Sequence, residues 1–205
     1  MPLYKTIQPK ENTKVLIWEI TEDLSFFNAI ELSENSINRL KNMKSEIHKK
    51  GFLSVRFLLK ELGYTDFDLF YTEDGKPHLK DGKRISITHS FNFSAIIVSD
   101  NIVGIDIEKN REKIIKIAPK FVGDEAGFID SNYLVDYLTV IWGAKESLYK
   151  IHPDGGLLFK KHLPIEPFKL QDKQTKGWIK KDTFYEVYRI YFEKIKEYTL
   201  VYALN

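Results

Sequence analysis

The chain has 205 residues, of which 43% are hydrophobic and 14% aromatic, so it can bury a core of its own and intrinsic disorder is excluded. The absence of cysteine excludes disulfide scaffolds, thiolate metal sites and cysteine nucleophiles from these residues. With 31 basic and 29 acidic residues the formal net charge is only +2, which does not indicate a nucleic-acid partner.

The first half of the chain mixes predicted helices with short predicted strands. Residues 14–20 form an apolar run that is typical of a buried strand. Ser33 opens a helical pattern, and a second helical run ends at Gly63, a residue that tolerates the left-handed conformation after a helix. From residue 67 to residue 99, apolar runs separated by Asp-Gly turns predict antiparallel strands. The apolar face of the first helical pattern comprises Ile37, Leu40, Met43 and Ile47.

The second half begins after a turn at residues 100–101 and repeats this mixture. Its predicted elements are a strand at 102–108, helices at 111–118 and 131–149, and antiparallel strands at 183–192 and 197–203. We therefore expect an α+β protein with two halves, residues 1–100 and 101–205.

Two carboxylates stand two residues apart in the first strand of the second half. Because residues two apart on a strand point to the same side, Asp106 and Glu108 should project outward together while Ile105 and Ile107 face the core. Two such charges repel unless a cation relieves them, and Mg²⁺ bound by carboxylates is one possibility. An exposed strand face paired with Lys or Arg is the other interpretation.

The strongest predicted helix carries a second group of charged residues. Trp142, Glu146 and Lys150 follow one another at steps of four, so they share one face, with Lys145 beside them. A glutamate between two lysines could bind a metal while the lysines hold phosphate oxygens. A simple Glu146–Lys150 ion pair along the helix is the alternative.

Two smaller groups in the first half could hold an anion. Lys76 follows a tight turn, and Thr88 and His89 end a predicted strand, which together supply a charge, a hydroxyl and an imidazole. A satisfied surface histidine is the alternative for His89. The basic run that contains Lys49 and Arg56 is typical of a solvated helix start.

The order and spacing of these motifs resemble the signature of the 4′-phosphopantetheinyl transferase superfamily. The signature is V-G-I-D-I-E at 103–108 followed by W-x-x-K-E-x-x-x-K at 142–150. The segments G-K-P at 75–77 and I-T-H-S at 87–90 resemble further family motifs in the right order. The length is similar to that of the monomeric Sfp-like branch.

The resemblance implies a fold and a reaction. The fold would consist of two similar α+β halves related by a pseudo-twofold axis, each a small, mainly antiparallel sheet packed with helices, with the active site between them. The enzyme, of the holo-[acyl-carrier-protein] synthase type, would move 4′-phosphopantetheine from coenzyme A to a serine of an apo acyl or peptidyl carrier protein. The reaction would need Mg²⁺ and would release 3′,5′-ADP.

The resemblance also assigns roles to individual residues. The positions that match the family's Mg²⁺ ligands are Asp106, Glu108 and Glu146. The positions that match coenzyme A contacts are Lys49, Arg56, Lys76, Thr88, His89, Lys145 and Lys150. The catalytic positions are Lys150, which would stabilise the departing phosphate, Glu146, and Glu125 or its neighbour Asp124 as the general base.

A non-catalytic scaffold of the same fold, which binds a carrier protein or coenzyme A, is the alternative function. The presence of all three acids and of Lys150 argues against it. No G-x-x-x-x-G-K-[ST] phosphate loop occurs, which argues against the commonest other class of Mg²⁺-dependent phosphotransfer enzyme. The N-terminal residues lack an apolar core and no stretch approaches the roughly 20 apolar residues of a membrane span. We therefore expect a cytoplasmic monomer without a membrane or nucleic-acid partner.

Overall fold

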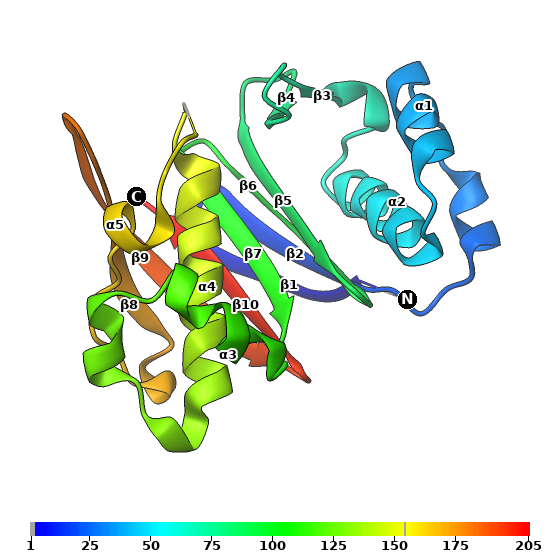
Figure 1. The fold of residues 1–205 in the computed structure, drawn as a ribbon. Helices are drawn as coiled ribbons and strands as arrows, with labels where there is room; N and C mark the ends of the chain where they lie inside the picture. The colour runs from blue at the N-terminus through cyan, green and yellow to red at the C-terminus, as the bar shows by residue number, and fades with distance from the viewer. Residues whose placement is uncertain (1–2, 154) are drawn as a thin grey trace. The chain divides into compact units, whose positions relative to one another are not determined.

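The chain divides into two compact units, Met1–Asp100 and Asn101–Asn205, and the computed structural model describes residues 3–153 and 155–205. Figure 1 shows the elements of both units in chain order. Each unit combines an antiparallel sheet with packed helices, which confirms the predicted α+β class. The pseudo-twofold relation stays a prediction. Among the described residues, no helix has both the length and the apolar character needed to cross a membrane.

The first unit is built on a four-stranded antiparallel sheet in the order β1-β2-β6-β5. Its strands are β1 (Leu3–Lys10), β2 (Thr13–Glu19), β5 (Arg84–Ser90) and β6 (Phe93–Ser99). A separate two-stranded sheet pairs β3 (Leu69–Tyr71) with β4 (Pro77–Leu79), and the helices are α1 (Glu34–Asn42) and α2 (Glu46–Glu61). Strand β1, at the edge of the larger sheet, was not predicted.

Helix α2 covers one face of the larger sheet because its apolar side chains recur on one side. Each Leu or Phe that leaves water in this way contributes roughly 1.5–3 kcal/mol of hydrophobic free energy. The buried residues of this core include Phe52, Val55, Leu58 and Leu59 of α2, Leu16 and Trp18 of β2, and Ile96 and Val98 of β6.

The ends of α1 and α2 agree with the prediction from the sequence at two positions and differ from it at a third. Ser33 caps α1 as predicted, because its Oγ accepts a hydrogen bond from the backbone N–H of Ser36 at 3.4 Å. The first helical pattern is nevertheless interrupted, since α1 ends with Met43 as its C-cap and α2 begins after Ser45. Gly63 ends α2 as predicted, with a φ of 84° in the left-handed region.

The second unit is built on a four-stranded antiparallel sheet in the order β7-β10-β9-β8. Its strands are β7 (Val103–Lys109), β8 (Gln174–Lys181), β9 (Phe184–Ile195) and β10 (Tyr198–Leu204). Its helices are α3 (Lys113–Ile117), α4 (Leu134–Ile151) and α5 (Phe159–His162). Helix α4 confirms the strongest predicted helix, whereas strand β8 was not predicted.

Helix α4 packs against β7 and β10 (Figure 1). One glycine of β7 and one glycine of α4 lie where the opposing element comes too close for a Cβ atom. A Cβ atom added at Gly104 of β7 would overlap the backbone carbonyl oxygen of Ser147. A Cβ atom added at Gly143 of α4 would lie 2.7 Å from Cγ2 of Val201 on β10. The absence of side chains at these two positions therefore lets α4 bring its charged residues down onto β7.

Candidate active site

The close contact between α4 and β7 brings Lys150 to Asp106. The Lys150 ammonium group donates a hydrogen bond to Asp106 Oδ1 at 3.0 Å and another to the carbonyl oxygen of Ile105 at 2.7 Å. Asp106 is only 5% exposed. The expectation that this carboxylate faces outward was therefore wrong, because α4 covers the face of β7 that carries it.

Glu146 is half-buried on α4, in the electrostatic field of two other carboxylates. Burial, which is the largest cause, and the negative charges of Asp106 and Glu108 together raise the pKa of Glu146 to about 7, although the Lys150 ammonium group partly opposes this rise. The side chains predicted to gather at this site are thus close enough to influence one another. Negative charge accumulates here, and an added cation would relieve it.

The donor atoms of this group suit Mg²⁺, which prefers hard carboxylate oxygens. Asp106, Glu108 and Glu146 supply such oxygens from two adjoining elements, and the raised pKa of Glu146 reflects its burial first and the repulsion from the other two carboxylates second. In the parts of the chain that the structure describes, no three His, Cys, Asp or Glu side chains already converge as a metal site. The chemistry of the residues therefore fits the ion, while the ligand arrangement itself stays a prediction.

Lys145 and Glu125 occupy places that differ from the roles expected for them. Lys145 is fully buried, and its Nζ lies 2.7 Å from Glu125 Oε1. The buried Glu125 carboxylate also accepts hydrogen bonds from the backbone N–H of Gly123 at 2.7 Å and of Ile165 at 3.1 Å. Burial lowers the pKa of Lys145. Lys145 was expected to contact coenzyme A and Glu125 to act as the general base. Because the two side chains form a buried ion pair, we no longer assign them these roles.

Arg56 is a third position where the structure gives a different role. Its guanidinium group is buried, with Nε 2.8 Å from Asp66 Oδ1. The other two nitrogens donate to the carbonyl oxygen of Phe52 at 3.0 Å and to Oγ of Ser36 at 3.1 Å. The donors expected to hold a phosphate are thus used to join α1 and α2, and we assign Arg56 a structural role.

This network yields a prediction about stability and pH. Asp66→Asn should lower the free energy of unfolding by about 3–5 kcal/mol at neutral pH, because it leaves the Arg56 charge buried without its partner. Burial alone would raise the pKa of Asp66, but the Arg56 charge and hydrogen bonds from Ser33 and Ser36 outweigh it and hold the pKa below the ordinary value of 3.8. The contribution of the Asp66 carboxylate to the free energy of unfolding is therefore complete above pH 3.8. It is lost as the pH falls through the lower pKa that Asp66 has in the folded state.

Urea titrations of the wild type and Asp66→Asn, at neutral pH and at several values below 3.8, measure this difference. The two unfolding free energies should approach each other in acid. A gap that stays constant down to the lowest pH would show that the carboxylate charge is not what stabilises the network.

The remaining predicted residues of the first unit lie on three elements. His89 is exposed near the end of β5 and lies against the start of α2, where its ring centroid is 6.1 Å from that of His48 and a Cβ atom added at Gly51 would lie 3.0 Å from its Cγ. Thr88, next to it, is buried. Lys49 follows His48 in the first turn of α2, next in sequence to the residue that His89 approaches. The third element, the turn between β3 and β4, carries Lys76.

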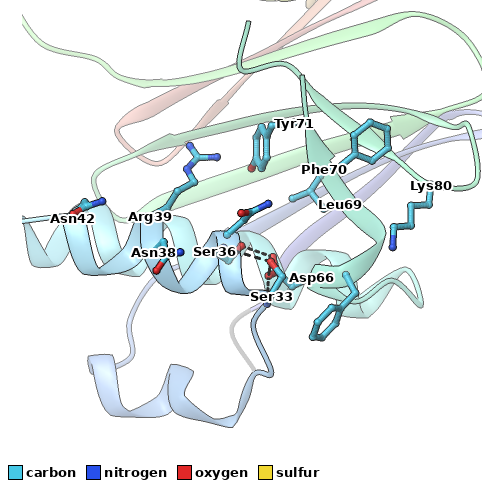
Figure 2. A pocket seen from close by; sticks show the side chains of 12 residues that line it. Ser33, Ser36, Asn38, Arg39, Asn42, Asp66, Leu69, Phe70, Tyr71 and Lys80 are labelled. Carbon is cyan, nitrogen blue, oxygen red and sulfur yellow. Dashed lines mark hydrogen bonds between the residues drawn. The ribbon is translucent and has the colours of Figure 1, made fainter. Parts of the chain in front are cut away.

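The first unit also holds a pocket of about 570 Å³ that the sequence did not predict (Figure 2). It lies between α1 and the segment that includes β3, and Arg39 and Lys80 provide cations in its lining. The Arg39 guanidinium lies over the ring of Tyr71 at 4.5 Å. The signal in the sequence was a polar stripe at helical spacing along α1. This stripe comprises Asn35, Asn38, Arg39 and Asn42.

Comparison with known proteins adds one relative. The chain is 30% identical over 154 residues to the 4′-phosphopantetheinyl transferase gsp of Aneurinibacillus migulanus, which covers 72% of this chain and 63% of that protein. The chain therefore spans less than two thirds of the relative's length. No family model matches the chain.

Proposed function

Because the chain belongs to the 4′-phosphopantetheinyl transferase superfamily, in its Sfp-like branch, we propose that it transfers 4′-phosphopantetheine from coenzyme A to a serine of an apo acyl or peptidyl carrier protein. The single observation that carries the proposal is the contact of Lys150 with Asp106 beside Glu146. A cation and carboxylates at this spacing suit a pyrophosphate substrate. The finer expectations of a cytoplasmic monomer of the holo-[acyl-carrier-protein] synthase type belong to the same proposal.

The reaction replaces the phosphoanhydride bond of the coenzyme A pyrophosphate by a phosphoester bond to the carrier serine. The oxygen of the carrier serine attacks the phosphorus that bears pantetheine, and the bond from this phosphorus to the bridging oxygen of the pyrophosphate breaks. The 3′,5′-ADP leaves with the electron pair of that bond, and the serine proton passes to solvent. Catalysis of this kind rests on positioning and on neutralising charge. Lys150 supplies a positive charge for the departing phosphate.

Asp106, Glu108 and Glu146 are the residues that would hold Mg²⁺. When bound, the ion would neutralise the charge of the pyrophosphate oxygens. The protein's own part would be to keep these carboxylates within each other's electrostatic influence despite their repulsion, by packing α4 closely on β7 at Gly104 and on β10 at Gly143.

The nucleotide end of coenzyme A would bind the first unit. Lys49, Lys76, Thr88 and His89 remain the proposed contacts there, whereas the buried Arg56 is not among them. None of these four residues lines the pocket beside α1. Its two cations and aromatic side chains would suit a phosphate and a base respectively, so we propose it as a further contact for the nucleotide.

Arg39→Ala tests the use of this pocket. We expect the KM for coenzyme A to rise about tenfold while kcat changes little, because a lost charge-assisted contact of about 1.4 kcal/mol corresponds to that factor. The matched control is Lys41→Ala, since Lys41 is exposed on α1 and does not line the pocket. Steady-state kinetics with varied coenzyme A provide the measurement. Equal KM values for the two variants would exclude the pocket from coenzyme A binding.

The release of 3′,5′-ADP tests the proposed function itself. Purified protein, coenzyme A, Mg²⁺ and an apo carrier protein should give this product in an amount equal to the carrier modified, as measured by chromatography. Binding of coenzyme A without any 3′,5′-ADP would favour the non-catalytic scaffold instead.

A further inference from the structure

The Lys145 ammonium group is enclosed by oxygen atoms of the protein. Besides its contact with Glu125, it donates a hydrogen bond to the carbonyl oxygen of Phe121 at 2.7 Å and another to that of Phe159 at 3.2 Å. An ammonium group has three hydrogen atoms to donate, and these three oxygen atoms of the second unit accept all of them.

These contacts attach two chain segments to α4. Segment A comprises residues 121–128 and segment B comprises residues 157–165, which includes α5. The residues that join the segments to Lys145 or to its carboxylate partner are Phe121, Gly123 and Glu125 of segment A and Phe159 and Ile165 of segment B. One buried ion pair therefore connects α4 with the segment that precedes it and the segment that follows it.

Both segments stand on the side of α4 that carries the candidate active site. The ring of Trp142 lies 5.1 Å from that of Phe121 and 5.3 Å from that of Phe159, measured between centroids. Trp142 and Glu146 are four residues apart on the helix, so they share this side. The aromatic residues of segments A and B thus form walls beside the helix turn that bears Glu146.

We propose that the Lys145–Glu125 pair is a positioning clamp for the transferase reaction. It holds segments A and B against α4 and thereby fixes Glu146 and Lys150 relative to β7, without either member touching coenzyme A. This role rests on the proposed function. Lys145 and Glu125 are positioning residues, and their effect on turnover passes through α4.

Three variants and a control separate this role from its alternatives. Lys145→Met removes the cation and leaves a buried carboxylate without its charge partner. Adding Glu125→Gln to that variant removes the uncompensated charge, so the double variant should regain much of the melting temperature that the single variant loses. Glu125→Gln alone keeps the length of the side chain. Lys161→Met is the control, because Lys161 is exposed in segment B.

The clamp predicts a separation between stability and turnover. In the double variant, kcat should stay reduced by about ten- to a hundredfold, because misplacement of catalytic groups by about 1 Å can cost about a hundredfold. The KM for coenzyme A should remain within about twofold of the wild-type value. Amide hydrogen exchange should be faster in segments A and B of the double variant and unchanged in the first unit.

Three results would overturn the clamp. A raised KM for coenzyme A with an unchanged kcat would mean that Lys145 contacts the substrate. Recovery of kcat together with the melting temperature would mean that the pair serves stability alone. Exchange rates in segments A and B equal to those of the wild type would mean that the pair does not hold them. The exchange measurement needs no turnover, so it decides the clamp even if the wild type transfers nothing, in which case the proposed function has failed separately.

Discussion

Glu146→Gln is expected to reduce phosphopantetheine transfer by about a hundred- to a thousandfold, the size of effect found when an enzyme loses one preorganised group that stabilises transition-state charge. The change removes a negative charge that the site would use and keeps the shape of the side chain. Burial and the neighbouring Asp106 and Glu108 already disfavour the charged carboxylate, so the neutral variant should be at least as stable as the wild type. Transfer rates and melting temperatures of the same preparations measure both effects.

The control for this variant is Glu112→Gln. Glu112 precedes α3 in the same unit, is exposed and caps no helix with its side chain. The Glu112→Gln substitution should leave both the transfer rate and the melting temperature unchanged. Near-normal transfer by Glu146→Gln would contradict the assignment of Glu146 to the site.

Gly104→Ala is expected to disrupt the second unit and its site together. The new Cβ atom would overlap the backbone carbonyl oxygen of Ser147, which cannot rotate away as a flexible side chain could. Helix α4 must therefore move off β7, and it carries Glu146 and Lys150 with it. Overpacking of this kind costs about 1–3 kcal/mol, and occasionally more. Transfer activity should fall to background even in the fraction that remains folded.

Gly127→Ala is the matched control for this substitution. A Cβ atom added at Gly127 meets nothing within 4 Å. Urea titrations and transfer assays should therefore find it close to the wild type, while Gly104→Ala loses both stability and activity. Equal behaviour of the two variants would show that the contact between β7 and α4 is not as close as described.

Much of the core could be predicted from the sequence because its pattern is strong there. The stripe on 131–149 is long and regular, and the structure places a helix at Leu134–Ile151. Gly63 ends its helix with backbone N–H groups of Gly63 and Tyr64 donating to Lys60 and Leu59, a local arrangement that depends on residues near in sequence. Features that depend on residues near in sequence could therefore be predicted from the sequence.

Edge strands were missed because most of their side chains meet water. Strand β1 has no buried residue along Leu3–Lys10, and the pattern of β8 is interrupted by Gly177, which stands between Lys176 and Trp178. Neither shows the alternation on which strand prediction depends. The break between α1 and α2 was missed for a related reason, because Met43 and Ile47 continue the apolar spacing across it.

The sequence identified the charged residues of the site but not their partners. Asp106 was expected to face outward, but it is buried. The strand pattern alone could not show this, because the burial comes from the packing of α4 on that face of β7. Arg56 and Asp66 are close in sequence, yet their pairing depends on how α2 meets the following turn. Lys145 and Glu125 pair across 20 residues of chain in a buried environment. Such pairs are set by tertiary contacts, which a linear motif does not contain.

The most direct test of transferase activity is the intact mass of an apo carrier protein after incubation with this protein, coenzyme A and Mg²⁺. A panel of acyl and peptidyl carriers should include at least one that gains a single phosphopantetheine group, and EDTA should suppress the gain. We expect the same gain with Lys161→Met and its loss with Glu146→Gln. Unmodified carriers throughout the panel, from a folded protein that has received coenzyme A and Mg²⁺, would contradict the proposed transferase activity.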